Sequence, residues 1–318
     1  MKKAFLALLI ISVFHGSAHA SDKVRIGFPD RAAQFVPLTL GEQRGFFSEE
    51  GLHAEFIRIV PTVAIAALVS GEIDYYTSIG SGVAASIRGL PVKVVACYVP
   101  SAPIAIIARP EIKTVRDLKG NTIGINTYGS PLEVIGRLIV KHFGLNPDNE
   151  VKFLATGLIE SRFAAMDQGM TAATLGSAPL DFLGKKKGFV AIARAHELFS
   201  YPASGLIASA KKIKEKPDEV KRVIKAGIKA NQYIPQNRAG TTQVIADWLK
   251  VDQEMAAATY ESVFKAFNDD GSIPQDGLRL VIEEAKRAAK VSREVSVNEV
   301  EHLSLLREAQ RELGIKGR

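Results

Sequence analysis

The hydrophobic pattern of the chain alternates between two kinds of segment. Short apolar runs, typical of buried strands, are separated by longer stretches in which apolar residues recur with helical spacing. The first half of this pattern predicts strands at residues 24–28, 52–59, 73–77 and 92–98, with helices at residues 36–47, 62–69 and 81–88 between them. Such alternation predicts an α/β fold in which helices cover a mostly parallel sheet.

The same alternation begins again after Asp117. It predicts strands at residues 122–126, 151–154, 172–175 and 189–193, with helices at residues 130–143, 161–167 and 179–185. Residues 66–82 also resemble residues 164–179, because each stretch has the pattern of a helix, a glycine turn, a short strand and a Gly/Ser helix start. We therefore expect two lobes of similar design.

Two extended apolar segments, residues 104–108 and 205–210, separate the predicted lobes. Because these segments bracket the second group of elements, we expect both of them to act as hinge crossings. The sequence beyond them predicts further helices at residues 218–233, 241–250, 253–267, 274–289 and 297–312. The expected division is residues 21–110 as the first part of lobe 1, residues 111–204 as lobe 2, and residues 205–318 as the return to lobe 1 with a helical C-terminal tail.

The first twenty residues have the pattern of a secretory signal peptide. Lys2 and Lys3 precede an apolar run at residues 4–14, and the small-x-small sequence Ala18-His19-Ala20 follows. This run is shorter than the roughly 20 apolar residues that a permanent membrane helix needs. We expect residues 1–20 to be cleaved near Ala20, which would place the mature protein in the periplasm.

Charge and cysteine content narrow the possible partners. Removal of Lys2 and Lys3 lowers the formal net charge from +7 to +5, which weakly favours anionic solutes. The basic residues form no stripe interleaved with aromatic residues, so no binding of nucleic acid is expected. The one cysteine, Cys97, lies in an apolar run and is expected to be a buried hydrophobic residue that forms no disulfide.

The sequence lacks the common catalytic motifs. His53, His142, His196 and His302 are not spaced with other ligands as in a zinc site, and HExxH, GxSxG, GxGxxG and phosphate-loop patterns are absent. We therefore expect no metal, no cofactor and no catalysis. An enzyme built on the same fold remains an alternative.

Small polar residues follow most of the predicted strands, where helices begin. In open α/β sheets ligands bind beyond the carboxyl ends of the strands, and free N–H groups at helix starts favour negative charge. Taken singly, such residues are more commonly helix caps. The residues concerned are Gln34, Thr62, Ser78, Gly80, Ser81, Thr127, Ser130, Thr156 and Ser177, and the aromatic residues Phe28, Phe35, Tyr98 and Tyr128 are candidates to line the same cleft.

Several segments resemble the nitrate/sulfonate/taurine family of ABC-transporter substrate-binding proteins. They are GFFSEEGL (45–52), SGEIDYYT (70–77), RGLPVKVVA (88–96), DLKG (117–120) and NTIGIN (121–126). The resemblance covers residues 23–210 and implies a type II periplasmic-binding fold, with two lobes and a hinge. It also implies a small-molecule solute, an ABC permease and its ATPase as partners, contact with the membrane only through the permease, and a monomeric chain.

The same resemblance places solute contacts on the candidate residues. They fall on residues 28–35, Thr62, residues 78–82, Tyr98, residues 127–130, Thr156 and Ser177. The candidates chosen among them are Phe28, Phe35, Thr62, Ser78, Gly80, Ser81, Tyr98, Thr127, Tyr128, Ser130, Thr156 and Ser177. The chain departs from the family in lobe 2, where the turn at residues 169–173 lacks the usual Asp that lobe 1 carries as Asp74. The first-lobe loops show no obvious buried arginine to mark a sulfonate or carboxylate.

These observations favour a binding protein for a small organic anion of the sulfonate, nitrate or carboxylate type. A binding protein for a pyrimidine or aromatic solute is the main alternative, because of the four aromatic candidates. An enzyme such as a pyrimidine-precursor synthase, and a sensor subunit that feeds a chemoreceptor, also remain open.

Overall fold

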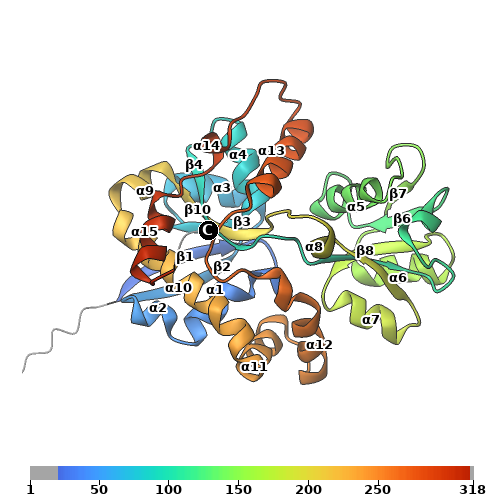
Figure 1. Ribbon diagram of the computed structural model, residues 1–318, viewed down its shortest axis with the longest axis horizontal. Coiled ribbons are helices and arrows are strands. Elements are labelled where there is room, and N and C mark those ends of the chain that lie inside the picture. Colours follow the sequence, from blue (N-terminus) through green and yellow to red (C-terminus); the bar gives the residue numbers. More distant parts are fainter. Residues whose placement is uncertain (1–20, 316–318) are drawn as a thin grey trace, which may run out of the picture.

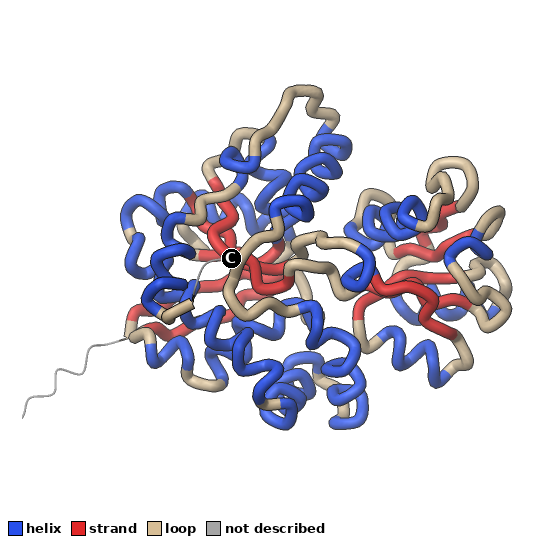
Figure 2. Tube along the Cα trace, in the orientation of Figure 1, coloured by secondary structure: helices blue, strands red, loops and turns tan. Residues whose placement is uncertain are grey.

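The computed structural model describes residues 21–315, so the predicted signal peptide at residues 1–20 lies outside the described residues. Two α/β lobes lie side by side and are joined by two short crossings (Figure 1). Each lobe is built on a five-stranded mixed sheet (Figure 2). The expected two-lobe α/β architecture is confirmed.

The sheet of lobe 1 has the order β2-β1-β3-β10-β4. Its strands are β1 (Asp22–Phe28), β2 (Leu52–Arg58), β3 (Tyr75–Ser78), β4 (Val92–Val99) and β10 (Ser204–Ser209). β1 is parallel to β2 and β3, whereas β10 is antiparallel to β3 and β4. The helices between the first four strands are η1 (Ala33–Phe35), α1 (Val36–Gln43), α2 (Phe46–Glu49), α3 (Pro61–Ser70) and α4 (Ile79–Ile87).

Lobe 2 repeats this arrangement, with the order β7-β6-β8-β5-β9. Its strands are β5 (Ile104–Ala108), β6 (Thr122–Ile125), β7 (Lys152–Ala155), β8 (Ala173–Ser177) and β9 (Val190–Arg194). β6 is parallel to β7 and β8, and β5 is antiparallel to β8 and β9. Its helices are η2 (Val115–Leu118), α5 (Pro131–His142), α6 (Ile159–Asp167), α7 (Leu180–Lys186) and α8 (Ala195–Leu198).

The internal similarity seen in the sequence corresponds to equivalent turns in the two lobes. Gly71 follows α3 and Gly169 lies just beyond α6, and both have positive φ, of 84° and 74°. This conformation is accessible to glycine at little cost, and it turns the chain sharply from the helix toward the next strand. β3 and β8 follow these turns and occupy the same place in their sheets.

The two segments expected to be hinges are interior strands of the sheets. Residues 104–108 form β5, between β8 and β9, and residues 205–209 belong to β10, between β3 and β4. The chain instead passes between the sheets at residues 100–103 and 199–203, where Ser101 and Tyr201 form a parallel bridge. The expected end of lobe 1 at residue 110 is therefore too late, because the apolar pattern of β5 reflects burial within the second sheet.

The helical C-terminal region is confirmed and covers lobe 1 (Figure 1). It comprises α9 (Ala210–Glu215), α10 (Pro217–Gln236), α11 (Arg238–Leu249), α12 (Gln253–Val263), η3 (Phe264–Ala266), α13 (Gln275–Ala289), α14 (Val297–Val300) and α15 (Ser304–Glu312). The helix predicted at residues 297–312 is divided, because Glu301 bridges to Val94 and the His302 N–H donates to the Val94 carbonyl. Within residues 21–315, none of the helices has the length and apolar character needed to cross a membrane.

The core of lobe 1 lies on both faces of its sheet. Neighbouring residues of β3 point to opposite faces, so Tyr75 belongs to the apolar cluster under α10 and Tyr76 to the one under α4. Cys97 is completely buried and free, as expected from its apolar surroundings.

Candidate functional site

The carboxyl ends of the parallel strands in each lobe face the other lobe. In lobe 1, Ser78 at the end of β3 pairs with Ser204, the first residue after a crossing. In lobe 2, Ser177 at the end of β8 pairs with Ile104, the first strand residue after the other crossing. Ala33, which follows β1, also packs with Ala178, which follows β8. The strand ends that carry ligands in open α/β sheets thus meet between the lobes.

The start of α4 presents polar groups at this edge of lobe 1. The hydroxyl groups of Ser78 and Ser81 lie 3.0 Å apart, and both residues are half-buried. No described side chain caps the first turn of α4, and a Cβ at Gly80 would meet no atom within 4 Å. The Ile79 N–H at the start of α4 donates to the Ala203 carbonyl at 3.3 Å, so the N–H groups that follow it in this turn are the ones open to a ligand from the gap between the lobes.

A second polar cluster at this edge joins Asp30, which lies within the expected range 28–35, to Tyr76, which was not predicted from the sequence. Tyr76 is fully buried, and its hydroxyl has no hydrogen-bond partner among the described residues. Asp30, in the loop after β1, is close enough for its charge to raise the pKa of Tyr76 further, beyond the larger effect of burial. Burial also raises the pKa of the Asp30 carboxyl, and the positive charge of Arg58 opposes that rise. A carboxyl and a phenol that lack protein partners can accept from and donate to a solute.

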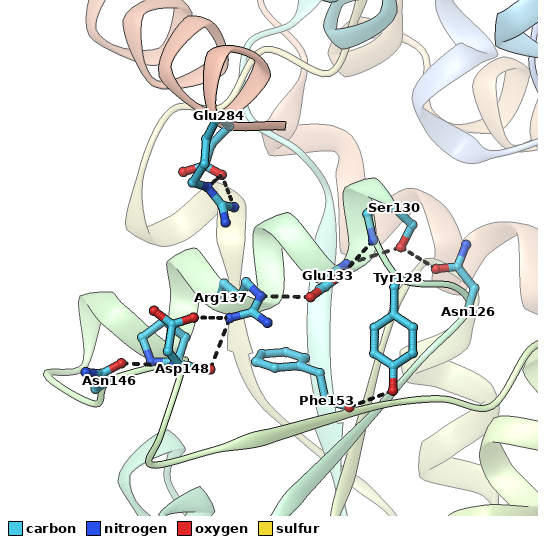
Figure 3. Close-up of polar contacts among 12 residues, drawn as sticks. Asn126, Tyr128, Ser130, Glu133, Arg137, Asn146, Asp148, Phe153 and Glu284 are labelled. Atoms are coloured by element: carbon cyan, nitrogen blue, oxygen red, sulfur yellow. Dashed lines mark hydrogen bonds and ion pairs between the residues drawn. The ribbon is translucent and has the colours of Figure 1, made fainter. Parts of the chain in front are cut away.

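The start of α5 in lobe 2 is occupied by the protein's own side chains (Figure 3). The Ser130 hydroxyl accepts from the Glu133 N–H at 3.4 Å and donates to Oδ1 of Asn126 at 2.5 Å. The Glu133 carboxylate accepts from the Gly129 N–H at 2.6 Å and from Nε of Arg137 at 2.8 Å. Ser130 is therefore a helix cap, and a carboxylate already lies where an anion would bind.

The other lobe 2 candidates lie at the same edge with different surroundings. Thr127 and Tyr128 are exposed, and the Tyr128 hydroxyl donates to the Phe153 carbonyl at 3.2 Å (Figure 3). The half-buried Thr156 donates its hydroxyl to the Ile125 carbonyl at 3.4 Å, and Ser177 is half-buried at the end of β8. In lobe 1, Thr62 lies in the first turn of α3, and its side chain is outside the described part of the structure.

Comparison with known proteins identifies the family. Residues 32–239 match the family described as NMT1/THI5 like, which covers more than half of the chain. The chain belongs to this family.

Known proteins resemble this NMT1/THI5-like chain in sequence and in fold. The riboflavin-binding protein RibY of Chloroflexus aurantiacus is 26% identical over 256 residues, covering 71% of this chain and 72% of RibY. The periplasmic aliphatic sulphonate binding protein SsuA of Escherichia coli has a TM-score of 0.69 at 15% identity, covering 88% of this chain and 92% of that one. The periplasmic nitrate-binding protein NrtA of Synechocystis PCC 6803 has a TM-score of 0.72 at 15% identity, covering 92% of this chain and 89% of that one. The expected periplasmic-binding fold is confirmed.

Three aromatic candidates of this NMT1/THI5-like protein are core residues. The Phe28 ring lies 4.8 Å from the ring of Trp248, and Phe35 belongs to the same buried cluster. Tyr98 is 1% exposed and lies against α10, where a Cβ at Gly227 would overlap its ring. Helices α10 and α11 cover these three rings, so their burial argues against the expected contact with the solute, which stays a prediction.

A groove between lobe 2 and α12 lies apart from the candidate residues. It has a volume of about 850 Å³ and is lined by residues of α7, β9, α8, α12 and η3. At one end, the Ser262 hydroxyl donates to Oδ2 of Asp181 at 2.7 Å, and the Arg194 guanidinium donates to the same oxygen at 3.2 Å. These contacts connect α12 of the C-terminal region to α7 and β9 of lobe 2.

Proposed function

We propose that this protein is the solute-binding component of an ABC importer and holds a small organic anion between its two lobes. The observation that carries this proposal is the pair of sheets with matching strand order, whose strand ends face each other across two short crossings. Membership of the NMT1/THI5-like family supports it, as do the names of the sulphonate- and nitrate-binding proteins that share the fold. The protein works in the periplasm as a monomer, delivers its solute to a permease with an ATPase, and catalyses no reaction.

The crossings at residues 100–103 and 199–203 act as the hinge in this proposal. They are the segments that join the two sheets within the described residues, and they contain little regular structure. Rotation about these segments would bring the start of α4 toward lobe 2 and exclude water from the solute. Residues 21–103 and 204–315 form lobe 1 in this proposal, residues 104–198 form lobe 2, and residues 1–20 are a cleaved signal peptide.

An anion is favoured by the chemistry of the α4 start. The N–H groups of its first turn that follow Ile79 and the hydroxyl groups of Ser78 and Ser81 are all hydrogen-bond donors. The dipole of α4 adds positive potential at the same place, and the net positive charge of the chain has the same sign.

A solute with ring N–H groups is the second candidate, and Asp30 supports it. Asp30 is exposed and its carboxyl accepts no hydrogen bond from a described residue, and the buried Tyr76 phenol, which its charge reaches, has no partner. Such a pair suits the edge of a nitrogen heterocycle, and the relative RibY is named for an aromatic ligand.

A thermal-shift panel separates these candidates. It would contain ethanesulfonate, nitrate, benzoate, uracil and riboflavin, with small-angle scattering on every compound that raises Tm. A hundredfold excess over Kd stabilises the protein by about 2.7 kcal/mol, and closure should reduce the radius of gyration. If Tm rises only with ethanesulfonate, nitrate or benzoate, the result supports an anionic solute. If Tm rises only with uracil or riboflavin, it supports a solute with ring N–H groups. Turnover of any compound by the purified protein would overturn the assignment as a binding protein.

A further inference from the structure

Arg162 is a buried positive charge without an acidic partner. This residue of α6 is 5% exposed. Its Nη1 donates to the Leu175 carbonyl in β8, and its Nε is sealed from solvent with no acceptor among the described residues. The one acidic residue whose charge acts on it is Glu160, which is exposed and forms no ion pair with it. Burial lowers the pKa of Arg162, so the fold holds this guanidinium at an energetic cost.

Other partly buried arginines of lobe 2 are neutralised. Arg137 pairs with Glu133 and Asp148, both at 2.8 Å, and Arg194 pairs with Asp181 at 3.2 Å. Arg162 is more deeply buried than either of them and has no ion pair with an acidic side chain among the described residues. Buried charges in proteins are normally paired, so an unpaired one indicates that a partner of opposite charge arrives from outside the chain.

Arg162 lies near the end of α6 that faces the gap between the lobes. α6 begins at Ile159, soon after the carboxyl end of β7, and Arg162 lies in its first turn. Helical side chains tilt toward the helix N-terminus, which here is the end facing lobe 1. The contact with Leu175, two residues before the end of β8, places the guanidinium beneath the carboxyl ends of the lobe 2 strands.

We propose that Arg162 binds the anionic group of the solute, which is a sulfonate or carboxylate. This inference rests on the proposed function and adds the residue and the chemical class to it. A guanidinium matches two oxygens of such a group with parallel N–H bonds, and Nε with Nη2 forms the required fork, because Nη1 already donates to Leu175. Since Nε is covered in the empty protein, the solute reaches it when the residues that cover it move aside on binding. The solute then neutralises a charge that the empty protein leaves uncompensated.

The test compares three variants on two pairs of probes that differ in charge. Benzenesulfonate is compared with benzenesulfonamide, and benzoate with benzamide, by calorimetry and thermal shift. Arg162→Met removes the charge, Arg162→Lys keeps it without the planar fork, and Arg137→Met is the matched control because it removes a paired arginine from the same lobe. We expect the parent and Arg137→Met to prefer the anion of each pair. Arg162→Met should lose that preference and bind the anion at least a hundredfold more weakly, with partial recovery in Arg162→Lys.

The Tm of each variant without solute is a second measurement, and it distinguishes a binding role of Arg162 from a structural one. Arg162→Met should keep or raise the Tm without solute, because it removes an uncompensated buried charge, whereas Arg137→Met should lower it. An unchanged anion preference in Arg162→Met overturns the inference and leaves the proposed function intact. Binding of the neutral probes alone by the parent overturns both the anion assignment and this role of Arg162. If no probe binds, a Tm that falls by several degrees in Arg162→Met makes Arg162 structural and overturns the inference, whereas a Tm that is kept or raised supports it.

Discussion

Replacement of Asp74 by asparagine tests whether the acid in the segment SGEIDYYT stabilises the fold. Oδ1 of Asp74 lies 2.8 Å from Nζ of Lys212, and Oδ2 accepts from the backbone N–H of Arg25 at 2.8 Å and from its Nε at 3.3 Å. Lys212 also contacts Glu219 at 2.9 Å, and Glu219 accepts from the Tyr75 hydroxyl at 2.9 Å. This network ties the start of β3 to α9 and α10, far from the candidate site.

The expected loss follows from the burial of the network. The side chains of Asp74 and Lys212 are 10% and 18% exposed, so solvent screens their attraction only weakly. Asp74→Asn keeps the shape but removes the charge and leaves an amide against the Lys212 ammonium. Breaking one contact of this kind costs about 1.5–3 kcal/mol, and loss of a whole buried pair about 3–5 kcal/mol. Because Lys212 keeps its ion pair with Glu219, the loss should lie between these two ranges, and we expect the free energy of unfolding to fall by about 2–4 kcal/mol.

Urea unfolding at neutral pH measures this loss, and Asp167→Asn is its control. Asp167 lies 3.6 Å from Lys187, and both side chains are about half exposed, so its replacement should cost at most about 0.5 kcal/mol. If the free energy of unfolding falls equally in the two variants, or by less than about 0.5 kcal/mol in Asp74→Asn, the network does not stabilise the fold.

The pH dependence of stability in the parent and in Asp74→Asn checks the direction of the pKa shift of Asp74. Burial acts to raise the pKa of Asp74, but the hydrogen bonds from Lys212 and Arg25 outweigh it and hold the pKa below its ordinary value. The contribution of a carboxyl with a depressed pKa is complete above its unfolded pKa, near 4, and is lost as the pH falls through the folded pKa. The parent should therefore approach Asp74→Asn in stability as the pH falls below about 4, and a constant difference down to pH 2 would contradict the shift.

Three further predictions separate binding residues from structural ones. Ser130→Ala should lower the free energy of unfolding by about 1 kcal/mol through loss of the helix cap, with little change in solute affinity. Ser81→Ala should instead weaken solute binding by about 1–3 kcal/mol. Equal losses of affinity in the two variants, measured by titration calorimetry, would contradict this division. Tyr98→Phe should leave the Kd unchanged and the stability equal or higher, because the buried hydroxyl has no partner, and a raised Kd would return Tyr98 to the site. Gly277→Val should hinder closure, because its Cβ would lie 2.8 Å from Cδ of Pro202 within the crossing at residues 199–203. An undiminished change in the radius of gyration on solute binding would refute this.

The alternation of strands and helices could be predicted from the sequence because it depends on local periodicity. Pro61 and Pro131 begin helices, as fixed φ favours at a first turn, and the glycine turns after α3 and α6 mark their ends. The hinge could not be placed in this way. An apolar run such as residues 104–108 has the same pattern in a crossing and in a strand buried on both faces, and the pairing with β8 and β9 depends on residues about 65–90 positions away.

The candidate site could be predicted only as a set of strand ends. The pattern of small polar residues located Ser78, Ser81 and Ser177 at the edge that faces the other lobe. It could not show that Glu133 fills the start of α5 or that α10 covers Tyr98, because both depend on tertiary contacts. The sequence of the lobe 1 loops shows no buried arginine, and Arg162, which the fold buries, lies in a helix of lobe 2.

The missing acid in the lobe 2 turn is explained by the surroundings of its counterpart in lobe 1. The Asp74 N–H donates to the Arg25 carbonyl at 2.9 Å, and the Ala172 N–H donates to the Thr122 carbonyl at the same distance, so the backbone turns correspond. Asp74 neutralises Lys212 and Arg25. In lobe 2 a threonine replaces that arginine, and Lys212 belongs to α9, which packs on lobe 1. Arg109 lies beside this turn, since its N–H donates to the Ala172 carbonyl at 2.9 Å, but its Nε already lies 2.8 Å from Oε1 of Glu111. A carboxylate at position 172 would be buried without counterparts of Lys212 and Arg25, so the absence of the acid reflects the C-terminal helices that cover one lobe.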